Sequence, residues 1–163
     1  MNKFKWGNIK NAKYLDPQSS DDISIFANVL NNTVTGLIKD GRLEDAKKVA
    51  NKYFEVMPTK FYGMRSMMGT YFMAENLYIL GEPDRANKLI EKSAVYIQKE
   101  LTYLADVSQS KNRFVGGQNV QLGMSFLSQM ARTAEEQKQT QLAKSLNDQF
   151  KALEVRFGPY FGQ

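Results

Sequence analysis

A turn followed five positions later by an alanine occurs three times in this sequence, and each copy leads into a helical stretch. The pattern runs Gly41–Ala46, recurs forty positions later at Gly81–Ala86, and appears in a weaker form at Lys138–Ala143. An alanine at this place lets the second helix of a helical hairpin approach the first closely, because the distance between packed helices depends on the side chains at their crossing. The sequence therefore predicts three antiparallel helical hairpins.

Apolar residues recur every three or four positions through most of the chain, which is the spacing of amphipathic helices, and strand-like alternation reaches no useful length. Pro58 marks one helix end, and Pro83 sits where the first turn of another helix tolerates proline. The fold class is therefore all-α, with six helices expected at about 19–40, 43–56, 60–80, 83–106, 118–136 and 139–157 and a loop at 107–117. The expected parts are an extended basic and aromatic arm over 1–18 and one helical-repeat domain over 19–163, with hairpins at about 19–57, 60–106 and 118–157.

The three hairpins resemble tetratricopeptide repeats, which stack such hairpins into a right-handed array. A small or medium-sized residue lies twelve positions before each alanine, at Val34, Ala74 and Ala131, where the first helix would be crossed. The repeats depart from the family in two ways, because their spacings are 40 and 57 residues instead of about 34 and no copy has the full aromatic pattern. A plain six-helix bundle is the alternative architecture.

The composition excludes several kinds of chemistry. None of the 163 residues is cysteine or histidine. Structural zinc sites, thiol nucleophiles, iron–sulfur ligation and Ser-His-Asp triads are therefore ruled out. Three carboxylate pairs, Asp21-Asp22, Glu44-Asp45 and Glu135-Glu136, are adjacent in sequence, so the two members of each point to different sides of a helix. We expect no metal, no cofactor and no catalytic residue in this chain. An enzyme acting through Glu75 is the weakest hypothesis.

Charge argues against nucleic acid as the partner. The 22 Lys and Arg residues exceed the 17 Asp and Glu residues by only five, and along the helices the two signs are interleaved. Only residues 1–15 of the arm are uniformly basic, with Lys3, Lys5, Lys10 and Lys13 and no acidic residue. The most apolar stretch, 61–80, is interrupted by charged residues and is not expected to span a membrane.

Several segments together resemble one family along nearly the whole chain. They are Phe4–Asn8 with Tyr14–Asp16, Glu55–Pro58, Lys99–Leu104 and Gln139–Leu146. They are similar to the soluble C-terminal tail of bacterial multi-spanning membrane proteins related to protein O-mannosyltransferases, which are glycosyltransferases of the GT-C type. The resemblance implies a non-catalytic interaction domain that binds or presents an acceptor protein. It would lie at the periplasmic face of the inner membrane, attached through upstream segments.

A basic arm next to a membrane span would instead favour the cytoplasmic side, by the positive-inside rule. The alternative function is a free-standing cytoplasmic repeat adaptor for protein–protein interaction.

A binding groove is predicted on the first helix of each hairpin, because these helices line the concave surface of helical-repeat stacks. The first helix carries a stripe of polar residues, and the repeats place the equivalent positions of the second and third hairpins 40 and 97 residues further on. The candidate residues on this stripe and its equivalents are Asn28, Asn32, Thr35, Tyr71, Glu75, Gln129 and Arg132. Amides, hydroxyls, an aromatic ring and one charge of each sign suit an extended protein or peptide acceptor, with a glycan as the second ligand. The competing hypothesis is that these are ordinary solvated positions whose apolar neighbours are covered by the arm.

Overall fold

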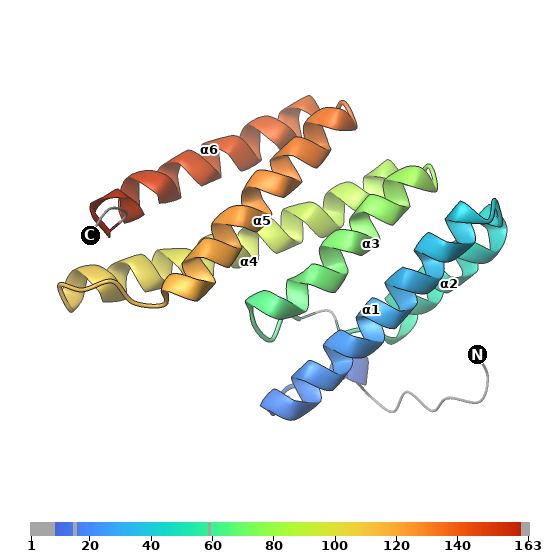
Figure 1. Cartoon of the computed structure of the whole chain (residues 1–163), viewed down its shortest axis with the longest axis horizontal. Helices are drawn as coiled ribbons and strands as arrows, with labels where there is room; N and C mark the ends of the chain where they lie inside the picture. The colour runs from blue at the N-terminus through green and yellow to red at the C-terminus, as the bar shows by residue number, and fades with distance from the viewer. Residues whose placement is uncertain (1–8, 15, 59, 161–163) are drawn as a thin grey trace. The chain divides into compact units, whose positions relative to one another are not determined.

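The computed structural model describes residues 9–14, 16–58 and 60–160, and all regular structure in them is helical. Six α-helices follow one another along the chain (Figure 1), which confirms the all-α class. They are α1 (Pro17–Lys39), α2 (Leu43–Val56), α3 (Met67–Ile79), α4 (Pro83–Ser110), α5 (Gly117–Glu136) and α6 (Thr140–Phe157). Single 3₁₀ turns are η1 (Ile9–Asn11), η2 (Met64–Ser66) and η3 (Gly158–Tyr160).

The third helix begins seven residues later than its apolar pattern indicates, at Met67 instead of residue 60. Gly63 adopts φ 148°, a backbone conformation that favours glycine, so the helix cannot extend back through it. The Ser66 hydroxyl donates to the Gly63 carbonyl oxygen at 2.7 Å and accepts from the Tyr62 amide at 3.1 Å. These bonds satisfy the irregular backbone ahead of η2 and α3.

Compared with the bounds expected from the sequence, α1 begins two residues earlier and α4 ends four residues later. At the start of α1, the Asp16 carboxylate accepts from the Ser19 amide at 3.0 Å and from its hydroxyl at 2.6 Å, so Asp16 is the cap of a helix expected to begin at about residue 19. Because these bonds favour the ionised carboxylate, they lower the pKa of Asp16. Near the C-terminal end of α4, the Ser108 hydroxyl accepts from the Val115 amide at 3.0 Å. The connection between α4 and α5 is therefore short and covers only residues 111–116.

The chain divides into two compact units, Met1–Ala86 and Asn87–Gln163. Their boundary lies in the first turn of α4, inside the hairpin expected over 60–106. In the first unit, α1 and α2 form a hairpin and α3 packs against α1. The start of α4 is fixed to α2, because the Arg85 guanidinium lies 4.4 Å from the ring centre of Phe54 and donates to Asn51 Oδ1 at 2.9 Å.

In the second unit, α5 and α6 form a hairpin, and α4 is hydrogen-bonded to α6 at two places, with both helices running in the same direction. Two side-chain hydrogen bonds define this direction. Asn87 donates to Gln139 Oε1 at 2.8 Å, and further along both helices Arg156 donates to Asp106 Oδ1 at 2.6 Å. The ring of Phe114 stacks on Tyr160 at a centroid distance of 5.7 Å and closes the C-terminal end of the unit.

The repeated turn seen in the sequence is present three times with the same hydrogen bonds. In each copy the residue after the helix cap has a positive φ: 72° at Gly41, 76° at Gly81 and 59° at Lys138. The next amide then bonds back five residues, at 2.8 to 2.9 Å, in the pairs Arg42–Leu37, Glu82–Leu77 and Gln139–Ala134. This is the Schellman motif, which satisfies the last free carbonyls of a helix.

The three alanines that follow these turns are buried, as predicted. Ala46 and Ala86 have no exposed surface and Ala143 is 3% exposed. The small residues expected opposite them, Val34, Ala74 and Ala131, are buried as well.

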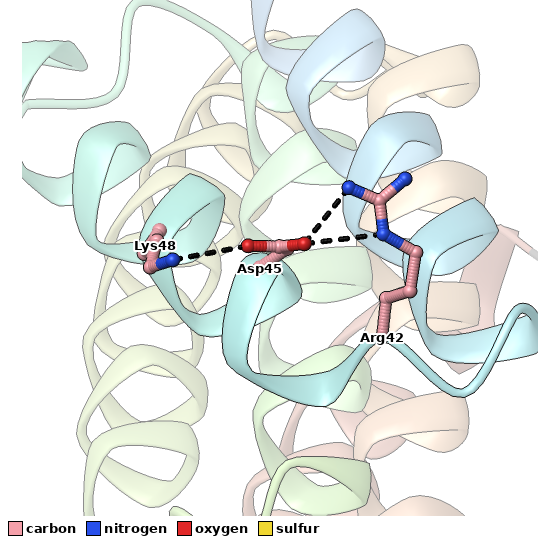
Figure 2. A network of polar contacts seen from close by, with 3 residues as sticks. All are labelled: Arg42, Asp45 and Lys48. Carbon is pink, nitrogen blue, oxygen red and sulfur yellow. Dashed lines mark hydrogen bonds and ion pairs between the residues drawn. The ribbon is translucent and has the colours of Figure 1, made fainter.

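Charge pairing adds to the turn at the start of α2 (Figure 2). Asp45 lies between two cations, accepting from Arg42 Nη2 at 2.8 Å and from Lys48 Nζ at 3.1 Å. The hydrogen bonds from Arg42, followed by those from Lys48, lower the pKa of Asp45. Arg42, Asp45 and Lys48 thus form an ion-pair network on the exposed side of the first turn of α2.

Candidate functional site: one face of α1 and α3

The contact between α1 and α3 is close and polar at its centre. Asn31 is 2% exposed, and its amide nitrogen donates to the Gly69 carbonyl oxygen at 2.7 Å. A methyl group at Gly69 would come within 3.0 Å of Ala27 Cβ, so the glycine permits this approach. Further along both helices, the Thr35 hydroxyl donates to Asn76 Oδ1 at 3.1 Å. The two helices are therefore parallel neighbours (Figure 1).

The sides of α1 and α3 that point away from α2 carry exposed apolar side chains. On α3 the side toward α2 is marked by Thr70, whose hydroxyl lies 3.3 Å from the Tyr53 hydroxyl of α2. On α1 that side carries the buried Leu30 and Val34. The opposite positions, spaced by three and four residues, form one surface, which we call the α1–α3 face: Ile25, Asn28, Val29 and Asn32 of α1 with Met68, Phe72 and Glu75 of α3.

Four large apolar side chains in this face remain accessible to solvent: Ile25 is 60%, Val29 54%, Met68 36% and Phe72 42% exposed. Scattered apolar side chains are normal on a protein surface, but a contiguous group of them marks interaction sites. The face holds one ionisable group, Glu75, whose carboxylate accepts from the Tyr71 hydroxyl at 2.7 Å. It therefore combines exposed apolar area with side-chain amides and a single carboxylate.

The structure separates the sequence-predicted residues into three groups. Asn28, Asn32 and Glu75 lie on the α1–α3 face. Thr35 is half-buried in the contact between α1 and α3, and Tyr71 is buried, touching the face through its bond to Glu75. The last group is exposed on α5 in the other unit, where Gln129 donates to Ser125 Oγ at 3.2 Å and Arg132 pairs with Glu136 at 3.2 Å.

The apolar residues that α1 contributes to the face were not among the sequence-predicted site residues. Ile25 and Val29 are four residues apart and lie off the buried stripe that contains Leu30 and Val34. That offset was the available signal, because apolar residues on a second side of a helix have no core to face.

The described part of the arm lies against α2. Residues Ile9–Asn11 pack on that helix, and the Tyr62 hydroxyl donates to the Ala12 carbonyl oxygen at 2.7 Å. Tyr14 is 78% exposed. Phe4, Trp6 and Leu15 of the arm lie outside the described part of the chain.

A small cavity of about 30 Å³ lies behind the face, between α1, the end of α2 and the start of α3. The hydroxyl groups of Tyr53, Ser24 and Thr70 belong to its lining residues. Burial raises the pKa of Tyr53, so this phenol stays neutral. A cavity of this size holds about two water molecules and is too small for a metabolite.

Within the described residues, no three acidic side chains gather in a way that could hold a metal ion. None of the helices described there has both the length and the apolar character of a bilayer span. Comparison with known proteins finds no match: no family model fits the chain, and no curated protein and no solved structure is significantly similar to it.

Proposed function

We propose that this chain is a non-catalytic helical-repeat interaction domain whose α1–α3 face binds an extended segment of an acceptor protein. The observation that carries the proposal is the group of four exposed apolar side chains on two neighbouring parallel helices. Burying such side chains against a partner contributes roughly 25 cal/mol per Å² of apolar area removed from water.

The amides of the face favour an extended partner. Asn28 and Asn32 are four residues apart on α1, which places them about 6 Å apart along the helix. An extended chain repeats every two residues, about 6.6 Å. Each amide can therefore donate to and accept from alternate peptide groups, while the apolar side chains on either side accommodate the partner's own side chains.

The single carboxylate of the face adds a preference for charge. Glu75 is half-buried beside Phe72, and Tyr71 donates one hydrogen bond to it. A carboxylate accepts several hydrogen bonds, so a Lys, an Arg or an amide of the partner fits opposite it. A polyanion such as nucleic acid would meet no basic stripe here.

The wider setting rests on the family resemblance of the sequence. In that setting the chain is the extramembrane tail of a membrane glycosyltransferase-like protein at the periplasmic face of the inner membrane, and it presents the acceptor to catalytic machinery upstream. The isolated chain should then neither hydrolyse glycosides nor transfer sugar. Turnover by the purified chain that disappears in Glu75→Gln would contradict this.

The test uses a peptide library selected on the full chain, followed by affinity measurement for the enriched peptides by fluorescence anisotropy. We expect peptides with apolar residues at alternate positions, and a loss of affinity of about tenfold or more in the variant Val29→Lys/Phe72→Lys. The control is Val95→Lys/Val155→Lys, which changes two exposed valines of the other unit.

Two results would reject the α1–α3 face as the binding site. One is equal binding by the two double variants, both shown to be folded by circular dichroism. The other is a selection that enriches no peptide. Reading the full coding frame separates the two settings, since hydrophobic spans upstream support the membrane protein and their absence supports a free-standing adaptor.

A further inference from the structure

The row of α1 residues in the α1–α3 face continues one turn past Asn32 and ends at a glycine. Its members are Ile25, Val29, Asn32 and Gly36, at intervals of four, three and four residues. These intervals place all of them on one side of the helix. The backbone of Gly36 is that of an ordinary helical residue, and its carbonyl oxygen accepts from the Asp40 amide at 3.0 Å. The face therefore has a notch at this point, because the row continues there without a side chain.

Among the described residues, no packing contact requires a glycine at this position. A Cβ added to Gly36 would have none of their atoms within 4 Å, whereas a Cβ added to Gly69 would meet Ala27 Cβ at 3.0 Å. Glycine inside a helix is less stable than alanine, since it loses more conformational freedom on folding. A helical glycine with this cost and no internal reason is typical of a place where a ligand closely approaches the backbone.

The notch is bordered by the last turn of α3. The hydroxyl of Thr35, the residue before Gly36, donates to Asn76 Oδ1 at 3.1 Å, so the notch lies level with this end of α3. Ile79 follows Glu75 by four residues and belongs to the same side of α3. Its side chain is 60% exposed. The α3 border of the notch thus consists of one carboxylate and one exposed apolar side chain.

This border fits a long cationic side chain of a partner. Lys and Arg each combine an apolar stem with a charged head. The stem can pass over the Gly36 backbone and along Ile79, while the head pairs with the Glu75 carboxylate. At the end of α1, the exposed Lys39 and Asp40 balance each other in charge, so Glu75 gives the notch a net negative charge. A cation is therefore favoured over a neutral amide, and an anion is disfavoured.

We propose that Gly36 determines the specificity of the α1–α3 face by admitting a lysine or arginine side chain of the bound segment to Glu75. This inference rests on the function proposed for the face and names the class of residue that the partner carries at one position. From Ile25 to Gly36 the row extends about 16 Å along α1, which an extended segment of about five residues covers. The cationic residue lies at one end of that segment.

The first part of the test is the selection of a random peptide library on the full chain. We expect the enriched peptides to carry a Lys or Arg at a fixed distance from their alternating apolar residues. Fluorescence anisotropy then compares one enriched peptide with a twin in which glutamine replaces that cation. The twin should bind the parent chain about tenfold more weakly, because it loses a charge-assisted hydrogen bond.

Three variants show whether the notch and its carboxylate give this preference. Gly36→Leu fills the notch and should bind the enriched peptide about tenfold more weakly than the parent. It should not unfold at a lower temperature, since leucine is a better helix former than glycine. Glu75→Gln keeps the notch and should bind the peptide and its twin equally. Ala152→Leu, which adds the same side chain at an exposed position of α6, is the control and should bind as the parent does.

The outcomes separate this inference from the proposed function. Enriched apolar peptides without a cationic position would overturn the inference and leave the proposed function standing. The same holds if the parent binds the peptide and its twin equally, if Glu75→Gln still prefers the cationic peptide, or if folded Gly36→Leu binds as tightly as the parent. A selection that enriches no peptide would reject both.

Discussion

At the scale of single residues, Lys138 is the one departure from an otherwise uniform set of hairpin turns. It has φ 59° where the other two turns have Gly41 and Gly81. A side chain in the left-handed region costs roughly 1–2 kcal/mol, and glycine avoids that cost. We expect Lys138→Gly to raise the free energy of unfolding by about 1 kcal/mol, measured by urea denaturation. Lys151→Gly inside α6 is the control, and it should lower stability by about 1 kcal/mol. A destabilised Lys138→Gly variant would contradict the assignment.

The titration of Asp45 tests the ion-pair network at the start of α2. The hydrogen bonds from Arg42 are the largest cause of its lowered pKa, and those from Lys48 come second. Measured by the NMR shift of the carboxyl carbon, the pKa of Asp45 should lie below 3.8, the ordinary value for aspartate. It should rise more in Arg42→Gln than in Lys48→Gln. A larger effect of Lys48 would reverse the ranking of the two partners.

The same network gives stability a defined pH dependence. Because folding lowers the pKa of Asp45, its contribution is fully present above the unfolded value of 3.8 and is lost as the pH falls through the lower folded value. The stability gap between the parent and Asp45→Asn should therefore close below about pH 3.8. An undiminished gap at lower pH would assign the effect to something other than the charge.

At the scale of helices, the sequence predicted the positions of the hairpin turns well. It predicted less well which helix residues are exposed at the surface. Gly41 and Gly81, each with an alanine five positions later, were sufficient to predict two turns. Both the positive φ of the turn and the close crossing of the next helix depend on residues near each other in the sequence. The start of α3 was not predicted, since the apolar residues of 60–66 continue the helical pattern and the obstacle is the backbone of Gly63. Asn28 and Asn32 were predicted for the binding face, but Ile25 and Val29 were not, because apolar spacing alone does not say which residues lack a neighbour.

The alanines after the turns give a direct test of helix packing. Ala46 is fully buried in α2, so Ala46→Leu should overfill the crossing and lower stability by about 1–3 kcal/mol. Ala152 is exposed on α6, and Ala152→Leu should change stability by less than about 0.5 kcal/mol. Thermal unfolding of the two variants measures the difference. Equal effects would mean that the alanine after the turn is not required for close packing.

Two glycines of the first unit should respond to alanine with opposite signs. Gly36 in α1 has no atom within 4 Å of an added Cβ, so Gly36→Ala should stabilise the helix by about 0.5–1 kcal/mol. Gly69 in α3 would place that Cβ 3.0 Å from Ala27 Cβ, so Gly69→Ala should push α1 and α3 apart and cost about 1 kcal/mol or more. Urea midpoints of both variants measure the signs. A stabilising Gly69→Ala would show that the two helices do not approach each other this closely.

At the scale of the whole molecule, the pH profile of stability follows from which ionisable groups the chain lacks. It has neither histidine nor cysteine, the side chains that ordinarily titrate between the carboxylates and the lysines. The resolved shifts move groups away from neutrality: the pKa values of Asp16 and Asp45 are lowered from 3.8, and those of Tyr53 and Tyr96 are raised from 10.0 by burial. The pKa of Lys92 moves toward neutrality, lowered from 10.5 by burial of its ammonium group.

Stability changes with pH only where the folded and unfolded states bind different numbers of protons. We therefore expect the free energy of unfolding to vary by less than about 0.5 kcal/mol between about pH 6 and 7.5. Below that plateau, stability should fall as the paired aspartates gain protons. Above about pH 10 ionisation of Tyr53 and Tyr96 should reduce stability, because folding raises their pKa and their contribution is lost as the pH rises through the folded value. Urea unfolding at half-unit steps of pH measures the profile. If the free energy of unfolding instead changes with pH between about pH 6 and 7.5, a carboxylate or lysine with a strongly shifted pKa must be present. If this change is absent in Lys92→Met, Lys92 is its source.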